Sequence, residues 1–384
     1  MDIRDLTLDD FDAVLDSRQR AFGLLSAADV ERWRAMAEST FADGRYLGAF
    51  DGARLVATAR LRSFTQWWHG RPQPMAGIAS VTVTPEDRGR GAGRLIMRAA
   101  MGRAAELGDA VSALYPATTR IYRSLGWEHA GAQHLVRLPA EALRTIRPTE
   151  PVKLRRMGPD DAPDLVALLG RLHGAARSSG PVSWDENAWR TWLANPGDFL
   201  YLADDGFAVY RWKGDDIEVA GLMAGSEATA RALWSMVGTS ATMAKTVVAA
   251  VAPDDPVLWL VGDRDHEHVE QVRWMFRTID LAEAVARRGF PAALTLDAVV
   301  EVDDPERPAN SGPWRLEIAG GSGAATAAAS TAGAPRLSVN GFSALYAGVP
   351  TATLRRGGLM TGPGGFDEAL DSAFAAKPYM LDYF

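Results

Sequence analysis

The sequence of 384 residues contains no cysteine. Disulfide bonds, thiolate metal ligands and a cysteine nucleophile are therefore excluded. No apolar run approaches the ~20 residues of a membrane-spanning helix, and the first residues lack the basic and apolar segments of a secretory signal. The six histidines are scattered, and the pair His266 and His268 has no clear set of partner ligands. We therefore expect a cytoplasmic protein without a membrane span and without a metal.

Positive charge is scarcer than negative charge. The chain carries 41 basic and 48 acidic residues, which gives a net charge of −7. This balance disfavours nucleic acid as a partner and mildly favours cationic ligands. Hydrophobic residues make up 47% of the chain and charged residues 23%, as in globular proteins, and the length predicts two or three domains.

The most informative segment lies between residues 80 and 101. A β-branched run at 81–84 predicts a strand, which Pro85 ends. The next residues read Arg-Gly-Arg-Gly-Ala-Gly from 88 to 93, and good helix formers follow from Leu95. A glycine-rich turn between a strand and a helix N-terminus presents backbone N–H groups to an anion. The arginines of the segment would add charge-assisted contacts to a phosphate.

The spacing of the glycines and the residues after them exclude two common kinds of phosphate site. No Lys-Ser or Lys-Thr pair follows the glycines, which excludes a P-loop, and the third glycine is misplaced for a dinucleotide fingerprint. The remaining pattern, Arg-x-x-Gly-x-Gly after a strand, resembles motif A of the GNAT superfamily of N-acetyltransferases, which holds the pyrophosphate of acetyl-CoA. An arginine-rich surface turn that caps a helix is the alternative. The flanking strand and helix favour the coenzyme site.

A second element downstream supports this resemblance. Residues 117–127 read Ala-Thr-Thr-Arg-Ile-Tyr-Arg-Ser-Leu-Gly-Trp, in which Thr118 or Thr119 can cap a short helix that Gly126 ends. The Ile-Tyr pair followed by Leu-Gly-Trp is similar to a GNAT pattern whose tyrosine lies near the coenzyme sulfur. The resemblance implies that Tyr122, with an ordinary pKa of about 10, is the general acid that protonates the departing thiolate. A core tyrosine at a helix end is the alternative.

A short internal sequence repeat indicates a duplicated domain. The regions around Arg4 and Arg155 each read as a short strand followed by an Asp-capped amphipathic helix. In the second copy, the strand at 217–224 corresponds to the coenzyme strand, but its loop has only Gly225 and carries Glu227, whose charge would repel a pyrophosphate. We expect this second copy to lack catalytic activity. A smaller α+β domain should follow, with a mobile, Gly/Ala/Ser/Thr-rich loop at 320–334.

The last residues are unusually aromatic for a chain terminus. Tyr379, Tyr383 and Phe384 fall within the last six residues, and exposing them would be costly unless they dock. Either the segment packs against the sheet of its own domain, or it enters a cleft with the α-carboxylate of Phe384. Such a carboxylate, with an ordinary pKa of about 3.5, can accept a proton from a substrate ammonium.

Together these features resemble the Eis (enhanced intracellular survival) family of actinobacterial acetyltransferases. The resemblance covers the whole chain and implies an α/β fold with mixed sheets. It implies a catalytic GNAT domain at 1–145, a second GNAT-like domain without the coenzyme loop at 150–288, and a sterol-carrier-protein-like α+β domain at 289–384 with a docked C-terminus.

The resemblance also implies an activity and a set of residues. The activity is acetyl-CoA-dependent acetylation of primary amines on aminoglycoside- or polyamine-like cations, by an enzyme that is usually a hexamer. Tyr122 would be the acid and the carboxylate of Phe384 the base, with a backbone N–H near Val83 stabilising the oxyanion. Residues matching the coenzyme contacts are Val81, Thr82, Val83, Arg88, Gly89, Arg90, Gly91, Ala92, Gly93, Arg94, Ala117 and Thr118.

One departure bears on the substrate. Family members can place an acidic residue next to the terminus to hold a cationic substrate, whereas here Tyr383 is penultimate and Asp382 precedes it. No recognition set, with Glu31 or any other acidic residue, can be chosen from the sequence. Two other functions stay open, namely a protein lysine acetyltransferase and a non-catalytic ligand- or lipid-binding protein with a vestigial GNAT fold.

Overall fold

The structure, a computed structural model, describes residues 1–262 and 268–384, and its strands form two sheets. The strands of the larger sheet are β1 (Asp2–Asp5), β2 (Tyr46–Asp51), β3 (Arg54–Trp68), β4 (Arg71–Val83), β5 (Val111–Leu114), β6 (Glu128–Pro139), β7 (Arg155–Arg156), β8 (Val182–Ser183), β9 (Phe199–Ala203), β10 (Gly206–Lys213), β11 (Asp216–Ala224), β12 (Thr246–Val251) and β13 (His268–Thr278). The smaller sheet has β14 (Leu296–Asp303), β15 (Gly312–Ala319), β16 (Ser322–Ala327), β17 (Arg336–Ser338) and β18 (Met360–Thr361).

Helices cover both sheets. Those of the first half are α1 (Phe11–Phe22), α2 (Ala27–Ala42), α3 (Ala92–Glu106), α4 (Thr119–Arg123), α5 (Ala140–Leu143), α6 (Ala162–Ala175) and α7 (Glu186–Leu193). Those of the second half are α8 (Glu227–Gly238), α9 (Val257–Leu260), α10 (Leu281–Arg287), α11 (Val339–Tyr346), α12 (Thr351–Arg356) and α13 (Asp367–Phe374). In the described part of the chain, none of them is long and apolar enough to cross a bilayer.

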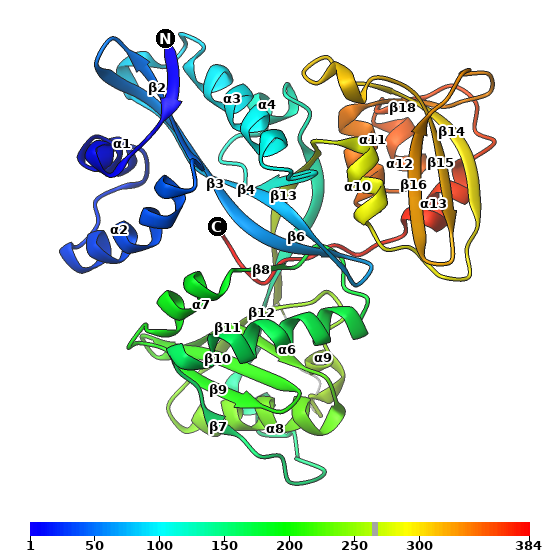
Figure 1. Cartoon of the computed structure of the whole chain (residues 1–384). Coiled ribbons are helices and arrows are strands. Elements are labelled where there is room, and N and C mark those ends of the chain that lie inside the picture. Colours follow the sequence, from blue (N-terminus) through cyan, green and yellow to red (C-terminus); the bar gives the residue numbers. More distant parts are fainter. Residues whose placement is uncertain (263–267) are drawn as a thin grey trace.

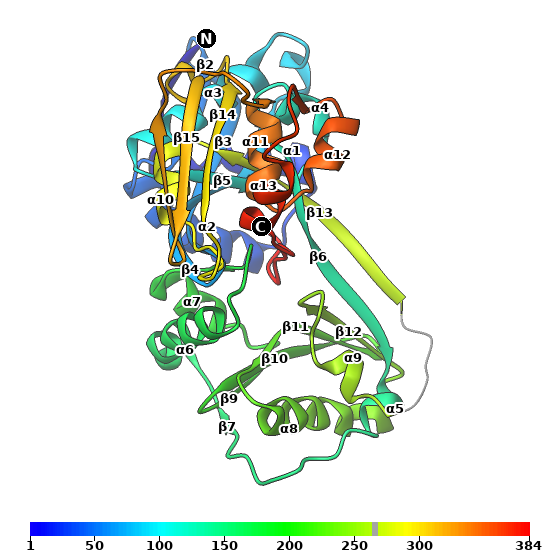
Figure 2. The ribbon, with the colours of Figure 1, turned by 90° about the vertical axis from the view of Figure 1, so that its right-hand side faces the viewer.

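The first two domains share one continuous sheet. Its order is β1-β2-β3-β4-β5-β13-β6-β12-β11-β10-β9-β7, with β8 paired to β3 (Figure 1). Strand β13 pairs with β5, where Met275 faces Leu114, and also with β6, where Val272 faces Gln133. Figure 2 shows β6 and β13 running side by side between the two domains. The sheet thus crosses the predicted boundary near residues 145–150, because a strand from the second domain completes the sheet of the first.

Two parallel strands in the first domain diverge and create an opening. Strands β4 and β5 pair from Met75 opposite Val111 to Gly77 opposite Ala113, and β4 then continues to Val83 alone on that side. Helix α3 covers one face of this region, where alanines of β3 allow the helix to approach closely. Helix α1 lies against the other face of β3 and β4 (Figure 1). Helices thus cover both faces of this part of the sheet, and the expected α/β fold with mixed sheets is confirmed.

The third domain packs α10 to α13 against the smaller sheet. The predicted mobile loop at 320–334 is wrong for its first part, which forms β16. Gly320 and Gly321, with φ of 59° and 83°, make the tight turn that returns the chain antiparallel to β15. Small residues give β16 little strand propensity of its own, so pairing with β15 decides its structure.

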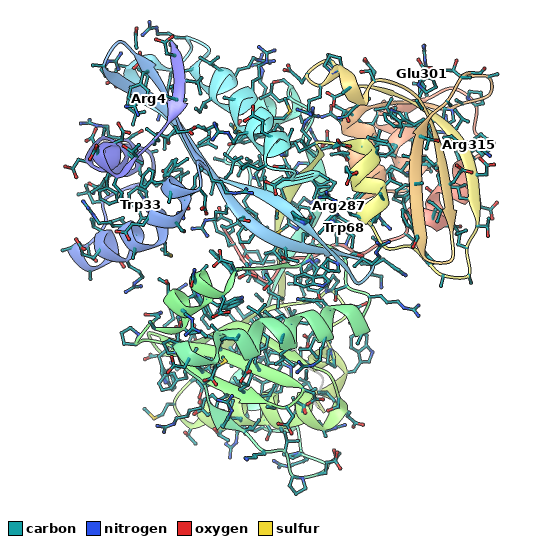
Figure 3. The ribbon with its side chains drawn as sticks, viewed as in Figure 1. Arg4, Trp33, Trp68, Arg287, Glu301 and Arg315 are labelled. Atoms are coloured by element: carbon teal, nitrogen blue, oxygen red, sulfur yellow. The ribbon has the colours of Figure 1, made fainter. Side chains whose placement is uncertain are left out.

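Trp68 marks the place where the first and third domains join (Figure 3). Its fully buried ring lies 5.1 Å from that of Phe276 on β13 and 5.1 Å from that of Tyr346 on α11. Arg287 adds a polar contact, because its Nη1 donates to the carbonyl of Gly108 at 2.9 Å. The third domain is therefore anchored on the domain that carries the opening between β4 and β5.

Candidate active site

The glycine-rich loop connects β4 to α3 as the sequence predicts. Gly89 and Gly91 have φ of 80° and 85°, a backbone region that favours glycine, and Gly91 directly precedes α3. A Cβ built at either position meets nothing within 4 Å, so the loop surface is open. Gly93 has a different role, because a Cβ there would lie 3.2 Å from Ile121 of α4. The first N–H groups of α3 have no intrahelical acceptors and face an approaching anion.

A cavity of about 460 Å³ lies over this loop. Its walls are the end of β4, the loop, the start of α3 and the residues around α4, namely Val83, Asp87, Arg88, Gly89, Gly91, Ala92, Gly93, Arg94, Thr118, Arg120, Ile121 and Ser124. An open glycine cradle at a helix N-terminus, with arginines at its rim, fits the pyrophosphate of acetyl-CoA. The structure therefore gathers Thr118 and the predicted loop residues other than Arg90 at one site.

The arginines of the loop have different surroundings. Arg88 is exposed, whereas Arg90 donates to Asp87 and, at 3.2 Å, to Asp51. Arg94 donates to Ser124 Oγ at 2.7 Å and lies 3.5 Å from Glu306 of the third domain. Only Arg88 among these three has no acceptor within the described residues. It is the arginine most available to a phosphate.

Asp87 is a loop residue whose role the sequence reasoning missed. Its carboxylate is 1% exposed and accepts from Thr84 Oγ1 at 2.7 Å, from Arg54 and from Arg90. The hydrogen bond from Arg54 is the main cause that holds the pKa of Asp87 well below its usual range. This ionised carboxylate fixes the strand end to the loop. An aspartate just before the glycines was the signal that could have revealed it.

Strand β4 bulges next to the loop. One extra residue of β4 lies opposite the segment from Thr58 to Arg60, and Ser80 adopts a left-handed φ of 48°. The bulge is held because Thr58 Oγ1 donates to the Ser80 carbonyl at 2.9 Å and lies 2.7 Å from Thr82 Oγ1. Bulges redirect backbone groups and often lie beside active sites. The positive φ of a serine such as Ser80 cannot be predicted from the sequence.

The neighbouring residues of β4 differ in how deeply they are buried. Thr82 is buried and lies 2.7 Å from Ser17 Oγ of α1, whereas Val81 and Val83 are only partly buried. Because their strand has no neighbour on the β5 side here, backbone groups of this segment are available to a ligand. Ala117 precedes α4 in the chain and does not line the cavity over the loop, whereas its neighbour Thr118 does.

Tyr122 lies on α4 and is 7% exposed. Its ring belongs to the core under α3, and within the described residues its hydroxyl has no hydrogen-bond partner. Burial raises the pKa of Tyr122, so the phenol holds its proton at neutral pH. Gly126, with φ of 95°, ends this turn of chain as the sequence predicts.

The C-terminal segment docks between the first two domains rather than on its own sheet (Figure 1). Gln133 Nε2 donates to the carbonyl of Leu381 at 2.6 Å, and Tyr115 Oη donates to the carbonyl of Asp382 at 2.9 Å. Trp184 Nε1 donates to Asp382 Oδ1 at 2.9 Å. The side chains of Tyr115 and Trp184 therefore fix the chain just before its end, and neither was anticipated from the sequence.

Phe384 lies against the strands of the first domain. Its ring centroid is 4.7 Å from that of Phe64 on β3 and 5.6 Å from that of Tyr115, which follows β5. A Cβ built on Gly77 would be 2.9 Å from its ring. Because Gly77 forms the last pair between β4 and β5, the chain terminus lies where these strands diverge. The ring of the terminal residue thus lies at the point where the predicted coenzyme opening begins.

Beside the terminus is a second, larger cavity of about 720 Å³. Its walls include Gln133, Trp184, Trp192, Leu381, Asp382 and Tyr383, from both domains and the C-terminal segment. Burial raises the pKa of Asp382 to about 6, against the opposing effects of Trp184 and Arg62. Above this pH the cavity offers a carboxylate to a cation.

The second domain differs at the corresponding loop. Strand β11 runs parallel to β12 and leads into α8, as β4 leads into α3. Here Ser226 caps α8 by accepting from Thr229 N, and Asp205 accepts from Thr229 Oγ1. A side-chain cap and a carboxylate therefore occupy the helix N-terminus, which disfavours an anion there.

No group of three or more metal-ligating side chains is found among residues 1–262 and 268–384. His268 is described at the start of β13, whereas His266 lies outside the described residues.

Comparisons with known proteins agree with this architecture. Residues 2–130 and 180–278 each match an acetyltransferase (GNAT) domain family, and residues 281–381 match the sterol carrier protein domain. An uncharacterized N-acetyltransferase of Streptomyces avermitilis is 29% identical, over 98% of this chain and 97% of its own length.

Two solved structures extend the comparison. A GCN5-related N-acetyltransferase from Kribbella flavida is 46% identical, with a TM-score of 0.95 over 100% of this chain and 98% of its own. Eis1 from Mycobacterium abscessus is 22% identical, with a TM-score of 0.77 over 100% of both chains, and supports the fold alone.

Proposed function

Because the chain belongs to the GCN5-related N-acetyltransferases, we propose that it acetylates primary amines of small cationic molecules, of aminoglycoside or polyamine type. Acetyl-CoA supplies the acetyl group as an activated thioester. The observation that carries the proposal is the position of Phe384, the chain terminus, at the divergence of β4 and β5. The α-carboxylate carried by this residue would then reach the cleft where the acetyl group must be transferred.

The residues that would hold acetyl-CoA line the opening between β4 and α4. Gly89, Gly91 and the first N–H groups of α3 would bind the pyrophosphate, and Arg88 would add charge. Backbone groups of β4 from Val81 to Val83 would hold the arm of the coenzyme. The bulge at Ser80 supports this role because it turns backbone groups out of the strand.

The amine would enter from the cavity beside Asp382 and Trp184. The carboxylate of Phe384 accepts a proton from the substrate ammonium, directly or through water, and the free amine forms the new N–C bond. A backbone N–H near Val83 stabilises the developing oxyanion. Tyr122 then places its proton on the departing sulfur as the C–S bond breaks, and the nitrogen gives its extra proton to the resulting phenolate. No covalent enzyme intermediate is needed, in keeping with a chain that lacks cysteine.

We further propose that the chain is an Eis-family enzyme that assembles as a hexamer and acts in the cytoplasm, where acetyl-CoA is available. The support is the order of the three domains together with the aromatic terminus docked in the first domain. The assembly can be measured by light scattering coupled to size-exclusion chromatography, and a monomer would contradict this part.

The test of activity is release of free thiol from acetyl-CoA with a panel of acceptors. Aminoglycosides, polyamines, arylalkylamines and lysine peptides are compared at equal concentration. Turnover with the cationic small molecules supports the proposal. Turnover confined to lysine peptides would favour the protein acetyltransferase instead, and absence of turnover with every acceptor would contradict the proposed substrates.

A further inference from the structure

The second domain contains a cavity of about 340 Å³ that the proposed reaction does not use. It lies at the ends of the parallel strands β11 and β12, beside α8, at the topological position that the coenzyme opening holds in the first domain. Its walls include Leu222 and Met223 of β11, Ala230 and Trp234 of α8, and the segment after β12. The C-terminal segment covers it with Lys377, Tyr379 and Leu381.

The interior of this cavity holds one carboxylate. Asp255 is 7% exposed, and its Oδ1 accepts from Val257 N at 2.9 Å. Within the described residues no cation forms an ion pair with it. The indole Nε1 of Trp234, which is fully buried, has no well-aligned hydrogen-bond acceptor there, although it lies near enough to Asp255 to lower the pKa of that carboxyl. Asp255 thus has one backbone hydrogen bond and no ion pair inside a formed cavity, an unusual state for a buried carboxylate.

The cavity rim carries charges of both signs, with one positive charge in excess. Lys377 Nζ lies 3.6 Å from Asp254 Oδ2, and both side chains are mostly exposed. Arg177 is also exposed. The remaining interior polar groups are neutral, since Ser178 Oγ and Tyr379 Oη lie 3.3 Å from each other. Asp255 therefore has no ion-pair partner among the described residues, and burial raises its pKa to about 6.

We infer that this cavity is a second binding site, for a small organic ammonium whose charged head pairs with Asp255. The apolar walls formed by Leu222, Met223 and Ala230 suit a short hydrocarbon or aromatic body. A bound ammonium would supply the charge-assisted hydrogen bond that the carboxylate lacks. The pyrophosphate end of a coenzyme would not fit, because Asp205 and the Ser226 cap occupy the start of α8.

The test is isothermal titration calorimetry of the full chain at pH 7.5 without acetyl-CoA. The probes are methylammonium, butylammonium and benzylammonium chloride, with benzyl alcohol as a neutral counterpart. Asp255→Asn keeps the acceptor for Val257 N but removes the charge, and Ala230→Leu fills the cavity. Asp254→Asn at the rim is the matched control. We expect at least one ammonium probe to bind, each interior variant to weaken it about tenfold or more, and Asp254→Asn to leave it within about twofold.

Two results would overturn the inference. One is no saturable binding of any of the three probes to the unmodified chain. The other is binding that Asp255→Asn and Ala230→Leu leave unchanged, which would place the probe in the cavity beside Asp382. The inference does not depend on the proposed function, because thiol release is measured separately. An inactive enzyme with Asp255-dependent binding would contradict the proposed function and leave the second site intact.

Discussion

The ring of Phe384, the last residue of the chain, packs 4.7 Å from the ring of Phe64 in the middle of β3. This contact joins the end of the third domain to the sheet of the first. Two aromatic side chains in such contact add to the stabilisation that their buried area gives. The contact holds the ring of the terminal residue close to Gly77, where β4 and β5 diverge.

Extension of the chain by one glycine after Phe384 should abolish turnover. The extension moves the carboxylate by one residue while the ring can stay on Phe64. Loss of a general base lowers the rate by about 10² to 10⁴, and the thiol-release assay measures it. Phe384→Leu is the matched variant, because it keeps the carboxylate in place and loses only ring contacts. Full activity with the added glycine would rule out the carboxylate as base.

Gly77→Ala should displace the terminal ring. A methyl group at this position would lie 2.9 Å from the ring of Phe384 and closer still to that of Phe64. Overpacking of this kind costs about 1–3 kcal/mol of unfolding free energy, and we expect kcat to fall with it. Denaturant unfolding and thiol release measure the two effects. Gly102→Ala on α3, where a Cβ meets nothing within 4 Å, should leave both unchanged or improve stability.

Tyr122→Phe should lower kcat by about 10² or more and leave the KM for acetyl-CoA within about twofold. The phenyl ring keeps its place in the core under α3, and only the hydroxyl is lost. Tyr201→Phe on β9, far along the sheet in the second domain, is the matched control and should be fully active. An equal loss of coenzyme binding and of turnover in Tyr122→Phe would argue against an acid role.

The glycine-rich loop could be predicted because the residues that determine its conformation are neighbours in the sequence. Glycines at 89 and 91 stand where the backbone needs positive φ, and the strand and helix flank them as the pattern requires. The repeat around Arg4 and Arg155 could also be recognised from residues that are neighbours in the sequence. Arg4 pairs with Asp10 at 2.7 Å and Arg155 pairs with Asp161 at 2.6 Å, in equivalent turns.

The features that escaped prediction depend on residues far apart in the chain. The insertion of β13 between β5 and β6 is set by pairing across domains. Asp304, buried in the third domain, pairs with Arg277 of β13 at 2.9 Å, and neither residue indicates the other in the sequence. Ser80 at positive φ is held by Thr58 on the next strand. Tertiary contacts decide such positions and local propensity does not.

Arg88→Ala should weaken acetyl-CoA binding, because Arg88 is the exposed arginine at the cavity over the loop. Loss of one charge-assisted contact should raise the KM for acetyl-CoA about tenfold and leave kcat within about twofold. The difference between variant and unmodified enzyme should shrink as salt is added. Arg20→Ala on α1, where Arg20 pairs with Asp16 at 2.7 Å on the surface, is the control. An unchanged KM would remove Arg88 from the coenzyme site.

The activity should depend on pH through Asp382. Burial raises the pKa of this carboxyl to about 6, so it is ionised above that pH and neutral below it. A neutral Asp382 loses its attraction for a substrate ammonium, and kcat/KM for the amine should therefore fall as the pH drops through 6. The Asp382→Asn variant should have a lower kcat/KM for the amine, and its pH profile should show no bend near pH 6.

Asp255→Asn is the matched control for this pH profile, because burial raises the pKa of Asp255 to about 6 as well, in a different cavity from that of Asp382. Its profile should keep the bend that Asp382→Asn loses. The position of Asp382 makes the assignment specific, since Trp184 holds its Oδ1 at 2.9 Å beside the cavity that the amine would enter. A bend near pH 6 that persists in Asp382→Asn would assign the titration to another group, with the terminal carboxylate of Phe384 the first to examine.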